Sequence, residues 1–202
     1  RSRGLETVSL IQKIYDTGGT VGGPIVRNKA WFFSSLRHWG NQHQMAGNYF
    51  NATQGTMFYT PDLDRPAFRY QWYRSRAGRV SWQVSDKNKI SGFADWAHQC
   101  ICRALGALRD YPEAGTNFMF KPVGLYQGSW TSPQTNRLLF EGGLSLAVFN
   151  FPRFRHPGVS PDDISILEQG TNMRYNNHAL LTGPDNSAPR FVQRFAVSYV
   201  TG

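Results

Sequence analysis

The 202-residue chain is poor in charged residues and cysteine, and it contains no long apolar run. Charged residues make up 17% of it, below the roughly 25% of an average soluble domain, which argues against a coiled coil or a solvated helical bundle. Two cysteines are too few for a disulfide framework. No segment approaches the roughly 18 to 20 apolar residues of a membrane-spanning helix, and the first residues lack the apolar stretch of a signal peptide.

Aromatic residues, glycine and positive charge are abundant instead. Aromatics reach 14%, glycine occurs 20 times, and 22 Lys and Arg against 13 Asp and Glu give a net charge of +9. Low charge with many aromatics and glycines favours β-structure with binding loops or a lipid-facing wall. The positive charge favours an anionic partner, whether nucleic acid, phosphate or a lipid surface, without choosing among them.

Apolar residues recur with a period of two far more often than with a period of 3.6, which predicts strands. The clearest case is the stretch 138–149, in which even positions are apolar or glycine and odd positions are more often small or polar. The even face reads Leu138, Phe140, Gly142, Leu144, Leu146 and Val148, and the odd face reads Leu139, Glu141, Gly143, Ser145, Ala147 and Phe149.

The predicted strands form three hairpins, and a seventh strand closes the chain at 190–201. Short polar turns are expected near 27–29, 85–89 and 132–136, whereas long connections rich in Asn, Gly, Pro, Asp and Thr are expected near 40–69, 103–123 and 152–189. Within the last connection, Ser160-Pro161-Asp162-Asp163 is a plausible start for a short helix over 162–169.

Short turns at one end, long loops at the other and strands near ten residues long are typical of an outer-membrane barrel. A tilted strand of roughly 9 to 11 residues crosses the hydrocarbon layer, and a closed barrel leaves no unpaired backbone in lipid. We therefore predict an all-β fold over 1–202: an antiparallel meander of long hairpins, part of a transmembrane β-barrel with long external loops.

Four segments in order resemble the TonB-dependent receptor family, in particular its large receptors with an N-terminal carboxypeptidase-regulatory-like domain. The segments are Gly18-Gly19-Thr20-Val21-Gly22-Gly23-Pro24-Ile25-Val26 with its following basic turn and aromatic run, then 79–90, 127–143 and 194–202. Barrels of this family are plugged and 22-stranded, so the resemblance implies that this chain is an internal segment of a longer receptor.

The resemblance also implies a function and partners. It implies uptake of a scarce ligand, such as a siderophore or an oligosaccharide, across the bacterial outer membrane, with outer-membrane lipid and lipopolysaccharide around the barrel. A TonB-type energy-coupling protein would act through a plug that this chain lacks. The alternative is a soluble all-β carbohydrate-binding module or a glycoside hydrolase-like domain, whose apolar strand faces would pack inwards.

Two sets of candidate binding residues follow from the loops and their edges. Aromatics in long loops are the candidates for ligand contact, because binding residues concentrate in loops. Arginines interleaved with aromatics could hold nucleic-acid phosphates, but on a barrel rim the same mixture binds lipid headgroups, which we favour. The ligand set is Trp39, Tyr49, Phe50, Tyr59 and Tyr175, and the lipid-headgroup rim set is Arg69, Arg74, Arg76, Arg153 and Arg155.

No catalytic residue, metal ligand or cofactor is predicted. The chain has no HExxH, GxSxG or Walker sequence, which leans against an enzyme without deciding the matter. A strand would put His98, Cys100 and Cys102 on one face, where they could capture a soft metal, although incidental thiols or a local disulfide are the simpler interpretation. Glu141 is expected to pair with Arg79 or Arg194 inside a lumen.

Overall fold

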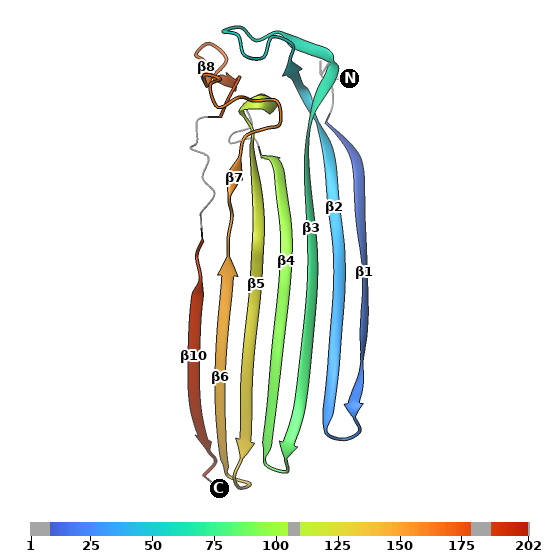
Figure 1. Cartoon of the computed structure of the whole chain (residues 1–202), viewed down its shortest axis with the longest axis vertical. Coiled ribbons are helices and arrows are strands. Elements are labelled where there is room, and N and C mark those ends of the chain that lie inside the picture. The colour runs from blue at the N-terminus through green and yellow to red at the C-terminus, as the bar shows by residue number, and fades with distance from the viewer. Residues whose placement is uncertain (1–8, 105–109, 179–186, 202) are drawn as a thin grey trace.

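The computed structural model describes residues 9–104, 110–178 and 187–201. It confirms the all-β class and the antiparallel meander, since one sheet contains the strands in the order β1-β2-β3-β4-β5-β6-β10, with β7 beside β5 and a separate β8–β9 hairpin (Figure 1). The strands are β1 (Leu10–Val26), β2 (Ala30–Asn51), β3 (Pro61–Ser85), β4 (Asn88–Ala104), β5 (Thr116–Pro133), β6 (Leu138–Phe149), β7 (Arg153–Phe154), β8 (Ile166–Glu168), β9 (Met173–Tyr175) and β10 (Arg190–Tyr199), with one 3-10 turn, η1 (Pro112–Ala114). Among the described residues, no helix is both long and apolar enough to cross a membrane.

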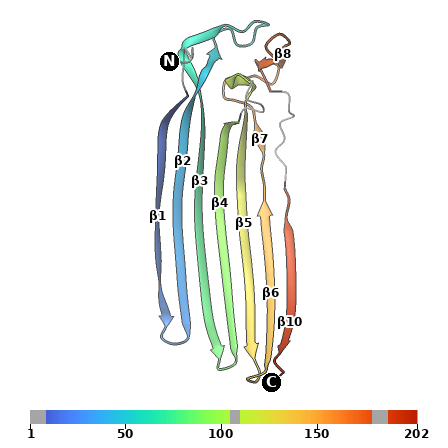
Figure 2. The same ribbon diagram turned by 180° about the vertical axis from the view of Figure 1, so that it is seen from behind.

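The two ends of the sheet differ, as Figures 1 and 2 show from opposite sides. The turns at 27–29, 86–87 and 134–137 lie together at one end, and the longer connections gather at the other. The first turn contains Asn28 with φ of 60°, a left-handed conformation that Asn tolerates better than most residues.

The strands extend further at the loop end than the sequence pattern predicted. β2 continues to Asn51 and β3 begins at Pro61, so the connection between them shrinks to 52–60. These extensions carry polar residues on both faces, which hides the period of two while leaving the backbone pairing intact. The helix expected over 162–169 is wrong, because the stretch contains β8, whose Leu167 pairs with Arg174 of β9.

The register gives the main sheet one apolar and one polar face, because directly paired residues point to the same side. One cross-strand row runs from Phe32 through Val80, Gly92 and Gly128 to Leu144. The apolar face carries exposed large side chains from every long strand: Val21, Val26, Phe32, Leu36, Val80, Trp82, Ile90, Trp96, Tyr126, Leu144, Leu146, Phe191, Phe195, Val197 and Tyr199.

The opposite face, which we call the polar face, carries most of the sheet's hydroxyl, amide and charged side chains. Its ion pair joins β1 to β2, with Arg37 Nη2 2.6 Å from Asp16 Oδ2. Both partners are exposed, so the pair contributes little to the free energy of unfolding. Exposed apolar exceptions on this face include Ile14, Trp31, Phe33, Phe149 and Val192. The main sheet therefore has no apolar core of its own.

The connections at the loop end pack into a cluster that we call the loop cap, formed by 52–60, 110–115 and 155–178. Glu113 of η1 accepts a hydrogen bond from the backbone N–H of Asn51 at 2.7 Å. The rings of Tyr59 and Tyr111 stack with centroids 3.7 Å apart, and the Tyr175 hydroxyl donates to the Met57 carbonyl at 2.9 Å. These contacts join segments between 52 and 118 residues apart in the sequence.

Gly40 in β2 is expected to tolerate no side chain. A Cβ there would lie 2.6 Å from the Tyr15 hydroxyl and 2.8 Å from the Gln71 carbonyl oxygen, so Gly40→Ala should lower the free energy of unfolding by about 1–3 kcal/mol. Gly92→Ala is the matched control, because a Cβ at that position has nothing within 4 Å. Equilibrium unfolding in urea measures both, and equal stability of the two variants would contradict the close packing at Gly40.

Candidate functional site

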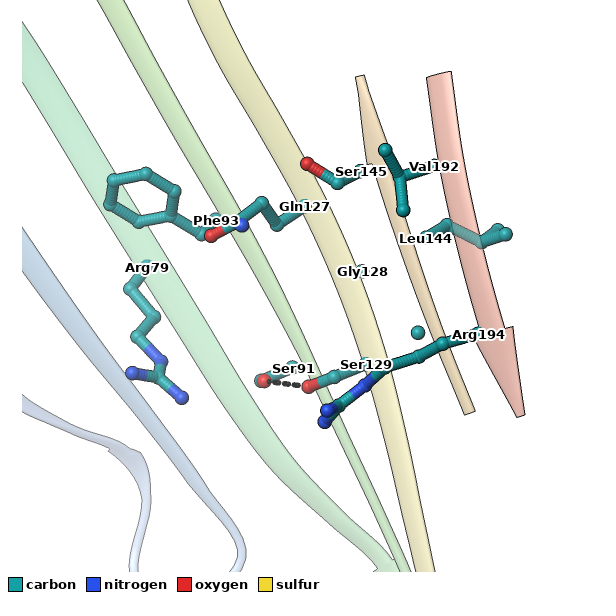
Figure 3. A pocket seen from close by; sticks show the side chains of 11 residues that line it. Arg79, Ser91, Phe93, Gln127, Gly128, Ser129, Leu144, Ser145, Val192 and Arg194 are labelled. Carbon is teal, nitrogen blue, oxygen red and sulfur yellow. Dashed lines mark hydrogen bonds between the residues drawn. The ribbon is translucent and has the colours of Figure 1, made fainter. Parts of the chain in front are cut away.

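A hollow of about 420 Å³ lies on the polar face, over strands β3 to β6 and β10 (Figure 3). Two cross-strand rows build it. In one row Arg194 pairs with Gly143, which pairs with Ser129. In the next row Arg79 pairs with Phe93, and Phe93 pairs with Gln127 of β5. The floor of the hollow is open because Ser91, Ser129 and Gly143 on the central strands are small.

Gly143 allows Arg194 to lie flat against the sheet. A Cβ on Gly143 would be 3.4 Å from both Cγ and Nε of Arg194, at the lower limit of ordinary van der Waals contact. The Arg194 side chain therefore crosses β6 and brings its guanidinium group towards Ser129 on β5, as Figure 3 shows. A branched side chain at position 143 would lift the arginine away from the hollow, because its Cγ atoms would extend into the space that Arg194 occupies.

Arg79 approaches the same hollow from β3 (Figure 3). Between the two arginines, the hydroxyls of Ser91 and Ser129 are hydrogen-bonded at 2.7 Å. Neither arginine has a carboxylate partner in the part of the chain that the structure describes, where the ion pairs are Arg37–Asp16 and Arg65–Asp62. The expected pairing of Glu141 with Arg79 or Arg194 is therefore wrong, because Glu141 belongs to neither ion pair; it lies opposite Thr131 of β5 and Ala196 of β10.

The hollow has the chemistry of an anion site. A guanidinium group presents a planar fork of N–H donors that matches a carboxylate or a phosphate, and two of them reach it from strands 115 positions apart in the sequence. Hydroxyl groups and the Gln127 amide supply further neutral donors. From the sequence, both arginines were expected only as partners of Glu141 and the serines were not expected in a site, since no sequence signal places β3 near β10.

The predicted ligand-contact aromatics are separated by the structure. Phe50 is buried near the end of β2, where its ring contacts His156 of the loop cap, and Tyr175 is buried in the cap itself. Tyr49 is half-buried, and Tyr59 stacks on Tyr111 in the cap. Trp39 lies within β2 rather than in a loop, and its ring stacks on Tyr73 with centroids 5.9 Å apart. The cap aromatics hold the loops together, and their role in ligand contact stays a prediction.

Burial shifts the pKa of titratable groups in the loop cap. It lowers the pKa of His156 to about 4, an effect to which the positive charge of Arg103 adds. It raises the pKa of Glu113, although the hydrogen bond from the Asn51 N–H opposes the shift. Burial likewise raises the pKa of Tyr59. The cap is therefore dry enough to favour neutral side chains.

The five predicted rim arginines also separate. Arg74 and Arg76 share the apolar side of β3 with Trp72 and Trp82, whereas Arg69 pairs with His43 on the polar face. Arg153 belongs to β7, and the Arg155 carbonyl accepts a hydrogen bond from Asn117 at the edge of the cap. Only two of the five therefore lie beside the exposed apolar surface, and their contact with lipid stays a prediction.

Cys100 and Cys102 are joined by a disulfide on one side of β4, which agrees with one of the two interpretations of the bare CxC. No group of three or more metal-ligating side chains occurs among the residues that the structure describes. The two sulfur atoms are therefore bonded to each other, and His98 belongs to no metal-ligating group among the described residues.

Comparison with known proteins adds no relative. No family model matches the chain, and neither a curated protein nor a solved structure matches it significantly. The geometry of the two faces and of the loop cap is therefore what bears on function.

Gly143→Val is expected to weaken anion binding in the hollow without removing a charge. The branched side chain would displace the Arg194 guanidinium, so the loss should match that of Arg194→Gln, about tenfold for one charge-assisted hydrogen-bonding group. Isothermal titration with inorganic phosphate measures it. Gly142→Val, the neighbouring position on the opposite face, is the control, and an equal loss in that variant would contradict the site.

The loop cap is expected to loosen as the pH falls from about 6.5 to about 4. The lowered pKa of His156 means that the unfolded cap takes up a proton in this range before the folded one does, so acidification favours opening, by an amount on the order of 2 kcal/mol. His156→Asn should remove this contribution. Glu113→Gln should steepen the pH dependence, because the raised pKa of Glu113 has the opposite sign.

Limited proteolysis of the cap over this pH range measures the effect. The rate of cleavage should rise least in His156→Asn and most in Glu113→Gln. Identical pH profiles for the wild-type chain and both variants would show that neither group is buried as the structure places it.

Proposed function

We propose that this chain is a barrel segment of a TonB-dependent outer-membrane receptor that takes up a scarce ligand, such as a siderophore or an oligosaccharide. The observation that carries the proposal is the exposed apolar face, continuous over seven long strands and backed by a polar face. Monomeric soluble proteins rarely expose apolar patches larger than a few hundred Å². In a barrel wall, this face contacts lipid and the polar face lines the lumen.

Strand length supports a membrane wall. β6 has 12 residues, which at about 3.4 Å per residue and a tilt of about 45° rise about 28 Å. On β4 the apolar side from Ile90 to Trp96 carries no charge. The longer strands continue beyond this band into the polar extensions below the loop cap, as the strands of large outer-membrane receptors do when they project into the external medium.

The position of the hollow supports a role in the lumen. In a closed barrel, the pair of arginines Arg79 and Arg194 would face the interior, where an anionic group of the ligand or of a plug could reach them. The plug is also the part on which a TonB-type protein would act. The edge strands β1 and β10 would then continue into the rest of the wall, because an open edge in lipid leaves backbone groups unpaired.

A pair of adjacent substitutions tests the proposal. Leu144 lies on the apolar face and Ser145 on the polar face, so Leu144→Arg would carry a charge into lipid at a cost of about 2–4 kcal/mol, whereas Ser145→Arg would face water. Flotation of the refolded chain with phosphatidylcholine vesicles should show loss of the floated fraction for Leu144→Arg only.

A soluble β-module gives a different result. The wild-type chain would then stay monodisperse in buffer without detergent and would not float, because its apolar face would be covered by protein. That outcome would overturn the membrane proposal and favour a carbohydrate-binding module.

A further inference from the structure

A row of cationic and imidazole side chains borders the apolar face on its loop side. Arg74 pairs across the sheet with His38 of β2 and with His98 of β4. One step nearer the apolar band, Arg76 lies between Leu36 and Trp96. Lys121 lies in the β-bulge of β5, opposite His98. The positive charges of Lys121, Arg74 and Arg76 all act on the His98 imidazole. We call these the basic row: His38, Arg74, Arg76, His98 and Lys121.

Among the residues that the structure describes, no carboxylate balances the basic row. The acidic residues of the neighbouring strands point to the polar face, where Asp95 accepts a hydrogen bond from Ser75 and Asp16 pairs with Arg37. Within the described residues, no ion pair includes a member of the row. The side chains of Arg74, Arg76 and Lys121 are exposed, and the Nε2 atom of His98 is buried without a hydrogen-bond partner.

Aromatic rings hold the guanidinium groups against the sheet. Arg74 lies over the Trp72 ring at 5.0 Å, and Arg76 lies 5.9 Å from the centroid of Trp96. The Trp96 ring also contacts His98, with centroids 4.4 Å apart. Amphipathic aromatic rings of this kind favour the boundary between hydrocarbon and headgroups. The cations are thus held in place at the edge of the apolar band.

We propose that the basic row binds the phosphate group of an anionic lipid whose acyl chains lie on the apolar face. This inference rests on the proposed function, because it needs that face to contact lipid. A lipid phosphate supplies the missing negative charge at the border, and its chains cover the Val, Leu and Phe side chains beside it. A nucleic acid would match only the charge, since its backbone would leave the adjoining apolar surface exposed to water.

The arrangement predicts selectivity for the number of phosphates. Three permanent cations, Arg74, Arg76 and Lys121, lie in adjacent strands β3 to β5 around one imidazole, so a headgroup with two phosphate groups should bind more tightly than one with a single phosphate. Hydrogen bonds from guanidinium to phosphate are charge-assisted and can be bidentate, which lysine alone would not provide. A zwitterionic headgroup carries its own cation and should gain little.

The test is native mass spectrometry of the whole chain in detergent micelles with three lipid probes. These are diphosphoryl lipid A, monophosphoryl lipid A and phosphatidylcholine. The wild-type chain should retain them in that order. The double variant Arg74→Gln/Arg76→Gln should lose about tenfold or more in affinity for diphosphoryl lipid A. Lys121→Gln, which removes no ring contact, should lose severalfold.

The matched control is Lys89→Gln/Arg190→Gln, which removes two exposed charges from the polar face outside the arginine hollow. Its lipid affinity should stay within twofold of the wild-type value. Equal losses in both double variants, or retention of phosphatidylcholine as strong as that of lipid A, would overturn the inference while leaving a membrane wall intact. Excess inorganic phosphate should not displace the lipid, and displacement would assign the row to free phosphate.

The result that would contradict the proposed function differs from the result that would contradict the lipid site alone. A chain that retains none of the three lipids and needs no detergent would overturn both the membrane wall and the lipid site. A chain that needs detergent and retains lipid without preference would overturn only the site.

Discussion

Backbone pairing between long neighbouring strands is the constraint on which the other features of this protein depend. Strands β2 to β6 pair their peptide groups with neighbours on both sides, and the edge strands β1 and β10 do so on one side. The antiparallel register decides which side chains share a face. A slip of one residue would exchange the positions of Leu144 and Ser145 and mix the two faces. The apolar wall, the arginine hollow and the basic row all exist because this register is kept from β1 to β10.

Large buried side chains are concentrated at the loop end of the molecule. Along most of its length the main sheet buries small side chains such as Ala30 and Ala97, whereas the large buried rings are Phe50 at the loop end of β2 and Tyr175 in the loop cap. The cap is held by hydrogen bonds between distant segments and by burial that keeps His156 neutral near physiological pH. The sheet below it has no such core, so its large apolar side chains need a partner outside the part of the chain that the structure describes.

Basic residues also lie on both faces of the sheet. Asp16 and Asp95 are turned to the polar face, so the basic row meets the apolar band without a balancing carboxylate. On the other face, Arg79 and Arg194 meet across serines. The basic residues that contribute to the net charge of +9 are therefore divided between the two faces of the sheet.

The sequence by itself determined the all-β class, the meander and the chemistry of the turns, because hydrophobic alternation as in 138–149 and turn residues such as Asn28 act within a few neighbouring positions. It did not show how far β2 and β3 continue, since polar residues on both faces erase the alternation, and its helix over 162–169 was wrong because pairing with β9 outweighed a local start signal. Only the tertiary structure placed Arg79 near Arg194 and Lys121 near Arg74. It also buried Phe50 and Tyr175, two aromatic residues that the sequence suggested were exposed. Those outcomes depend on strand order and register, which are contacts between residues far apart in the chain and leave no mark at any single position.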